Sequence, residues 1–152
     1  MVPRMMHSLA SPAAWVDLSA HAWAYPALEI VHIVGIGLLL GNLVLVELRV
    51  WGFGASLPLP ALARLALRVS LLGFGIAAVS GLVMFSSQPD ELLANRSFLV
   101  KMSLLALAGV NATAFHVRGG LVRLDRTARV QTALSLGLWL GVIICGRWIA
   151  YQ

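Results

Sequence analysis

The sequence predicts an all-α integral membrane protein, a four-helix bundle with a short N-terminal interfacial helix. The first observation is composition: 60% of the 152 residues are hydrophobic, 11% are charged, and the mean hydropathy is +0.89. A soluble domain typically carries about 25% charged residues, so this chain cannot cover a soluble globule with polar surface. The second observation is four apolar runs, each of about 20 residues, the length that crosses a bilayer as a helix.

The same composition excludes an ordinary soluble enzyme, a disordered chain and a disulfide scaffold. The chain has a single cysteine, Cys145, which lies within an apolar run and cannot form an intramolecular disulfide. The formal net charge is +5. Because the basic residues stand at the ends of apolar runs, we expect them to meet anionic lipid headgroups rather than nucleic acid.

Residues 1–24 are mixed in polarity and form the predicted N-terminal interfacial segment. They lack an apolar stretch followed by a small-residue cleavage site, so we expect no cleaved signal peptide. Ser11 and Pro12 are typical of a helix start. Trp15 and Trp23 then suit a helix that lies in the membrane interface.

Residues 25–152 form the predicted membrane domain, with spans at about 25–46, 65–85, 98–117 and 130–149. Each span must be helical, because lipid offers no hydrogen-bond partner to an open backbone. Connectors rich in glycine, proline and charge separate them, at residues 52–60, 88–91 and 118–120.

The arginines predict how the bundle is oriented. Seven lie in or beside the first and third connectors and three at the opposite ends, with Lys101 inside a span. Because basic residues accumulate on the cytoplasmic side, we expect a multi-pass protein of the bacterial inner (cytoplasmic) membrane with both termini periplasmic. The seven are Arg49, Arg64, Arg68, Arg118, Arg123, Arg126 and Arg129, and the three are Arg4, Arg96 and Arg147.

Two G-x-x-x-G pairs predict where helices approach closely. Gly37 and Gly41 form one in the first span, and Gly137 and Gly141 form another in the fourth. Such pairs let helix backbones come together. We expect these glycines to pack within the bundle rather than to drive oligomerisation.

Ionisable residues inside the spans are the candidate functional residues, because each costs roughly 2.5–3.5 kcal/mol in a membrane. Near the predicted outer face lie Glu29, His32, Lys101 and Arg147. His32 is expected roughly 10 Å deep and Lys101 roughly 5 Å deep. Glu29 stands one turn from His32 on the same helix face, so all four side chains are expected in one outer-leaflet pocket.

The residues near the predicted inner face are interpreted differently. Glu47 and Arg49 are expected to be charges at a cytoplasmic helix end. His116 is expected to be an interfacial histidine and is the less favoured metal ligand. It would lie about 17 Å from His32 along the membrane normal, which is too far for both to bind one iron.

Three interpretations of the outer cluster stay open from the residues alone. In the first, haem b lies between the helices on His32 and Lys101, with Glu29 orienting His32 and Arg147 binding a propionate. In the second, Glu29, His32 and Lys101 relay protons or ions. In the third, the cluster is structural: Glu29 neutralises Lys101 or Arg147, and His32 forms a hydrogen bond to another helix.

Several catalytic motifs are missing from the sequence. It contains no P-loop, dinucleotide-binding glycine motif, C-x-x-C-H, H-E-x-x-H or G-x-S-x-G. Covalently attached haem and zinc hydrolysis are therefore not expected, and we assign no catalytic residue.

The stretch Tyr25–Gly35 with Glu47-Leu48-Arg49 resembles an uncharacterised family of four-span bacterial inner-membrane proteins. The stretch Asn95–Lys101, Asn111 and His116 are similar to the same family pattern, so the resemblance runs from about Tyr25 to the C-terminus. It implies a four-span bundle.

A more distant similarity is to the CopD and HemJ-type superfamily. HemJ-type proteins, linked to protoporphyrinogen oxidation, carry a histidine early in one span, an arginine at its far end and a lysine opening a later span. His32, Arg49 and Lys101 are similar in order and spacing. The similarity implies b-type haem on His32 and Lys101, and a redox role. CopD-type proteins suggest copper, but the five methionines form no soft-metal cluster.

The leading expectation is therefore a haem b-binding inner-membrane protein with a redox or HemJ-like oxidoreductase role. The alternative is a non-enzymatic membrane subunit or a small-solute or ion transporter. The expected partners are the lipid bilayer and either a second copy of the chain or a membrane redox protein.

Overall fold

The computed structural model describes residues 22–151, so most of the predicted interfacial segment 1–24 lies outside the described residues. Within residues 22–151 the chain is helical without strands, and four helices are long and apolar enough to cross a membrane. The prediction of an all-α four-helix bundle is confirmed, and the chain is a multi-pass membrane protein. The long helices are α1 (Ala24–Val50), α2 (Leu59–Ser87), α4 (Arg96–Val117) and α6 (Arg126–Trp148).

Two short helices and a final 3-10 turn complete the described chain. They are α3 (Pro89–Ala94), α5 (Gly120–Arg123) and Ile149–Tyr151. The first three predicted spans each fall within one long helix, and the fourth ends one residue beyond α6. Helix α2 begins earlier than expected, since Pro60 lies in its first turn rather than in the connector. The N–H groups of the first helical turn have no partner within the helix. Proline, which has no N–H, therefore loses no hydrogen bond there and can start a helix.

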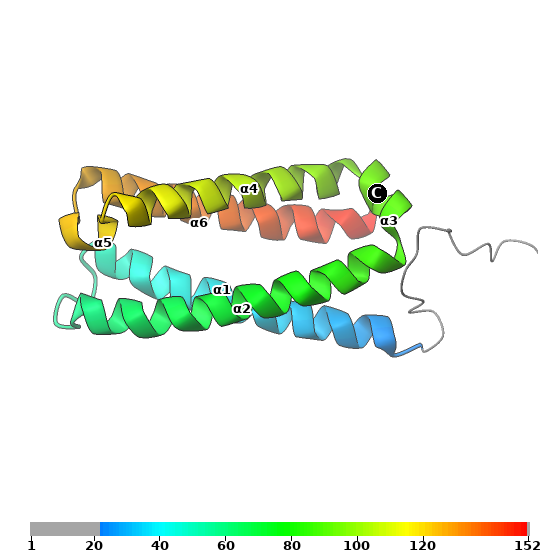
Figure 1. Ribbon diagram of the computed structural model, residues 1–152, viewed down its shortest axis with the longest axis horizontal. Helices are drawn as coiled ribbons and strands as arrows, with labels where there is room; N and C mark the ends of the chain where they lie inside the picture. The colour runs from blue at the N-terminus through cyan, green and yellow to red at the C-terminus, as the bar shows by residue number, and fades with distance from the viewer. Residues whose placement is uncertain (1–21, 152) are drawn as a thin grey trace, which may run out of the picture.

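The long helices form two antiparallel hairpins that lie side by side. Helix α1 packs along α2, and α4 packs along α6, whereas contacts between the two hairpins are fewer and involve mainly α1 and α6. Figure 1 shows α1 and α2 below, α4 and α6 above, and the α1–α2 connector at the same end as α5. We call this the connector end; α3 and the C-terminus lie at the opposite end.

The α1–α2 seam depends on small residues of α2 that repeat every three or four positions. Their spacing places them on one face of the helix, and all of them are buried: Ala63, Ala66, Ser70, Gly73, Ala77 and Ser80. At the crossing, a Cβ on Gly35 would lie 2.7 Å from the Ala77 backbone nitrogen, and one on Gly73 would lie 2.5 Å from the Leu39 backbone nitrogen. Glycine is therefore required at both positions for the helices to touch.

The predicted role of the two G-x-x-x-G pairs is wrong for most of their members. A Cβ at Gly37, Gly41 or Gly137 would meet nothing within 4 Å, and only Gly141 packs against a neighbour, Leu104. The spacing is typical of a close helix contact, but these three glycines make none within the described residues, and Gly37 lines a cavity instead. The close contact between α1 and α2 is formed by Gly35 and Gly73 instead.

The packed core of the molecule lies toward the connector end. Its buried cluster combines Val46 and Val50 of α1 with Phe115 of α4 and Ala128 of α6, together with the first turns of α2. The Nε1–H of Trp51 donates a hydrogen bond of 2.8 Å to Thr132 Oγ1, which ties the end of α1 to α6. The hairpins are thus held together firmly at one end.

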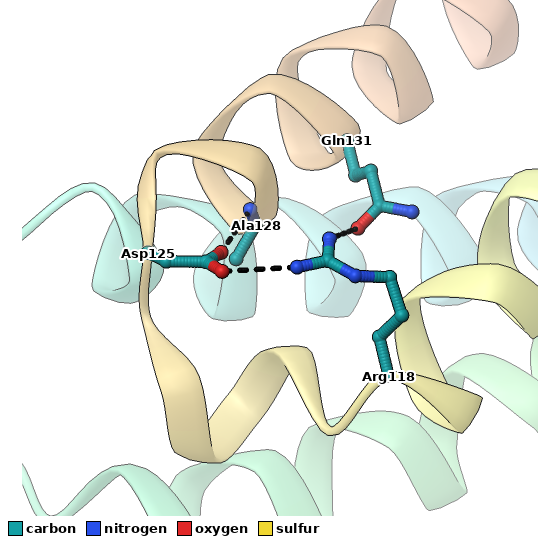
Figure 2. A network of polar contacts seen from close by, with 4 residues as sticks. All are labelled: Arg118, Asp125, Ala128 and Gln131. Carbon is teal, nitrogen blue, oxygen red and sulfur yellow. Dashed lines mark hydrogen bonds and ion pairs between the residues drawn. The ribbon is translucent and has the colours of Figure 1, made fainter.

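Two capping residues fix the ends of the second hairpin. The Asn95 side chain accepts from the Phe98 N–H at the start of α4, and its amide donates to the Ile149 carbonyl at the end of α6. At the connector end, Asp125 accepts from the Ala128 N–H at 2.8 Å and pairs with Arg118 at 2.9 Å, while Arg118 also donates to Gln131 (Figure 2).

We expect the Asp125 cap to make stability depend on acid pH. The Ala128 N–H, and secondarily Arg118, hold the pKa of this carboxyl below its usual range. Its contribution is therefore complete at neutral pH and is lost as the pH falls below about 4. Thermal unfolding in detergent should show Asp125→Ala less stable than Asp125→Asn, which keeps a capping oxygen. A gap between wild type and Asp125→Ala that did not shrink in acid would contradict this assignment.

Candidate functional site

A cavity of about 530 Å³ lies between the hairpins in the half of the bundle away from the connector end. We call it the His32 cavity. All four predicted outer-cluster residues line it: Glu29 and His32 from α1, Lys101 from α4 and Arg147 from α6. The remaining lining is mostly apolar, which is typical of a pocket that holds an organic ligand and orients it with a few polar groups.

His32 is held by a buried serine of the neighbouring helix. Its Nδ1 lies 3.0 Å from Ser80 Oγ, and that hydroxyl lies 2.7 Å from the Ile76 carbonyl oxygen. Since the hydroxyl donates its single proton to the carbonyl, its oxygen accepts from the histidine, which places the proton on Nδ1. The lone pair of Nε2 is then available to a ligand, an arrangement typical of metal-binding histidines.

The backbone around His32 leaves room for the ring. A Cβ on Gly81 of α2 would lie 3.2 Å from His32 Cε1. Any larger residue at position 81 would therefore displace the imidazole. Ser80 and Gly81 together fix both the tautomer and the position of the ring.

Lys101 enters the cavity from the other hairpin. Its Nζ packs against α6, 3.6 Å from where a Cβ on Gly146 would lie. The structure gives the amine no hydrogen bond or ion pair with any residue in 22–151. The cavity thus has one nitrogen donor from each hairpin, His32 and Lys101, and neither the Nε2 of the first nor the Nζ of the second is already used.

The structural interpretation agrees with the structure in one part only: His32 forms a hydrogen bond to another helix, at Ser80, but Glu29 pairs with neither Lys101 nor Arg147. Neither Glu29 nor Arg147 forms an ion pair within the described chain, where the measured pair is Arg118–Asp125. Arg147 instead donates to the Tyr151 hydroxyl at 2.7 Å and lies over its ring. His32 Nδ1 donates to Ser80 of α2, so Ser80 rather than Glu29 orients the His32 ring.

Aromatic side chains link the two hairpins beside the cavity. The rings of Phe85 on α2 and Phe98 on α4 stack with centroids 5.6 Å apart, and both residues line the cavity. They provide a flat apolar contact next to the polar groups.

His32 and Lys101 are too few to surround a bare metal ion, so they suit only a metal that already has other ligands. No group of three or more His, Cys, Asp or Glu residues in 22–151 could hold a bare ion. Haem iron already has four ring nitrogens, so one or two protein donors complete it. His32 and the amine of Lys101 are the donors in this cavity that would hold such a group.

The remaining predicted residues lie at the connector end. His116 lines a separate, smaller cavity of about 40 Å³ with Glu47, so it does not share a site with His32. The expectation that Glu47 is a solvated helix-end charge is wrong, because its side chain is only 2% exposed. Helix α1 continues to Val50, and α6 and the core cluster cover this face.

No family model, curated protein or solved structure matches the chain.

Proposed function

We propose that the chain is a haem b-binding protein of the bacterial inner membrane, with a redox or HemJ-like oxidoreductase role. One observation carries the proposal: a ligand-sized cavity is lined by His32 from one hairpin and Lys101 from the other, and neither His32 Nε2 nor Lys101 Nζ has a hydrogen bond within residues 22–151. The distant similarity to HemJ-type proteins points to the same two residues.

Each residue has a distinct role in this proposal. His32 would bind the iron through Nε2, Ser80 would hold its tautomer, and Lys101 would provide a second protein ligand as a neutral amine. Arg147 stands at the rim, where a guanidinium pairs well with a propionate carboxylate, and Glu29 lies nearby. Haem would supply one-electron transfer; the chain's own side chains bind it, orient it and keep water from it.

The orientation is part of the proposal. The first and third connectors, which hold most of the arginines, lie at one end of the bundle (Figure 1). The positive-inside rule places that end in the cytoplasm. The His32 cavity then lies in the periplasmic half, and an electron partner would be a membrane or periplasmic redox protein.

Replacement of Lys101 tests the pairing of the two ligands. We expect Lys101→Ala to bind haem with a shifted Soret band and, when reduced, to bind carbon monoxide, because one axial position is then open. Wild-type protein should react much less with carbon monoxide. Lys101→Arg, which keeps charge but cannot bind iron, should behave like Lys101→Ala. Identical spectra for wild type and both variants would exclude Lys101 as a ligand.

A proton or ion relay is the second candidate function. It is favoured by the presence of Glu29 and Lys101 in one cavity without an ion pair between them. A transporter of this kind would be colourless. It would show pH-coupled flux in vesicles that Glu29→Gln abolishes.

A further inference from the structure

Glu47 is a fully buried acid in the other half of the bundle. Its side chain is 2% exposed, and neither carboxyl oxygen has a hydrogen-bond partner within the described chain. Ser135 of α6 interacts with the carboxyl group, although outside hydrogen-bonding geometry. Burial of a carboxylate without a partner is very unfavourable. The Glu47 carboxylate must therefore either pair with a positively charged group or bind a proton.

Within residues 22–151, no basic side chain forms an ion pair with Glu47. Arg118, which directly follows α4, is bound to Asp125 and Gln131 (Figure 2). Arg49, on the same helix as Glu47, donates to the carbonyls of Leu57 and Ala55 in the connector. Helix α2 faces the cavity with Leu67, and α6 faces it with uncharged residues; His116 of α4 is the one other titratable group of the lining.

The cavity around Glu47 suits a proton better than a metal cation. A small hard cation needs about six oxygen ligands. Thr132 Oγ1 accepts from Trp51 and donates to its own helix, and the Asn111 amide donates to the Gln131 carbonyl. Most other lining residues are apolar, which leaves too few oxygens to surround a cation.

His116 connects this cavity to the surface of the bundle. It is exposed and lines the cavity. Its Nδ1 lies 2.8 Å from the Ala112 carbonyl oxygen, which can only accept, so Nδ1 carries a proton and Nε2 is free. The cavity of about 40 Å³ has room for water, since a water needs at least about 10–15 Å³.

We propose that Glu47 is a proton-binding site at the connector end and that His116 exchanges its proton with solvent. In uptake, the proton leaves Nε2 of the His116 imidazolium and joins a Glu47 oxygen, directly or through cavity water. The imidazolium becomes neutral imidazole, and the carboxylate becomes a neutral acid. The site is separate from the His32 cavity and does not depend on haem.

Infrared spectroscopy of the detergent-purified protein tests the proposal. We expect a carboxylic acid C=O stretch at neutral pH that shifts in D2O and disappears in Glu47→Gln. Glu91→Gln, which removes an exposed carboxylate on α3, is the matched control and should retain the band. Both variants should give the wild-type circular dichroism spectrum, because a neutral amide replaces the acid without change of shape.

The H/D exchange rate of the same band tests whether the proton passes through His116. We expect His116→Gln to slow its H/D exchange by at least about tenfold, whereas Arg129→Gln, an exposed basic residue of α6, leaves the rate unchanged. Absence of a Glu47 acid band at neutral pH would overturn the proton site, and so would its loss on addition of Na⁺. An exchange rate unaffected by His116→Gln would overturn the role of His116.

Discussion

His32→Ala is expected to abolish haem binding, the largest functional effect of any single replacement in this protein. The variant removes the one imidazole of the cavity, and alanine offers the iron no donor. A titration of purified protein with haem, followed at the Soret band, should saturate at one haem per chain in wild type. It should show only non-saturating, non-specific uptake in the variant.

Two further variants make this prediction specific. Ser80→Ala removes the partner of Nδ1, and loss of such a supporting hydrogen bond typically lowers metal affinity about 10–100-fold. His116→Ala replaces a histidine of the other cavity and should titrate like wild type. Equal haem affinity in wild type and His32→Ala would contradict the assignment of the axial ligand.

Gly73→Val is expected to produce the largest loss of stability. The added Cβ would lie 2.5 Å from the Leu39 nitrogen and 2.6 Å from the Gly35 oxygen. These are backbone atoms of α1, so the helices must move apart. Overpacking of a core costs about 1–3 kcal/mol and sometimes more, and a clash of two backbones belongs at the upper end of that range.

Gly75→Ala is the matched control for the seam. A Cβ on Gly75 would meet nothing within 4 Å, so the variant should unfold at the wild-type temperature or slightly above it. Thermal unfolding in detergent compares the two variants. If Gly73→Val were as stable as Gly75→Ala, the α1–α2 crossing described above would be wrong.

The seam shows what the sequence could and could not predict. The spans were predictable because length and apolarity alone decide them. A G-x-x-x-G spacing, however, describes one helix, and whether Gly37 and Gly41 meet a neighbour depends on how the helices are rotated. The better signal was the seven-residue spacing of Ala63, Ser70 and Ala77, which marks the face of α2 that carries small residues.

The cavity was predictable in part. Depth estimates grouped Glu29, His32, Lys101 and Arg147, and all four line the His32 cavity. Ser80 was missed because its contact with His32 joins residues 48 positions apart, and no local pattern encodes such a contact. Its place on the small-residue face of α2 was the available clue.

Glu47 was misread for a different reason. Its position directly after the predicted span, which ended at residue 46, suggested a solvated terminus, but α1 extends to Val50, and the second hairpin packs over this face. Burial of this kind depends on the docking of two hairpins rather than on the properties of one helix.

The visible absorption spectrum of the detergent-purified protein, oxidised and then reduced with dithionite, tests the central claim most directly. The protein should be expressed with adequate haem supply. We expect a Soret band at one haem per chain, with sharp α and β bands on reduction. A preparation that is folded by circular dichroism but colourless, and that stays colourless after haem is added, would contradict haem binding in the His32 cavity.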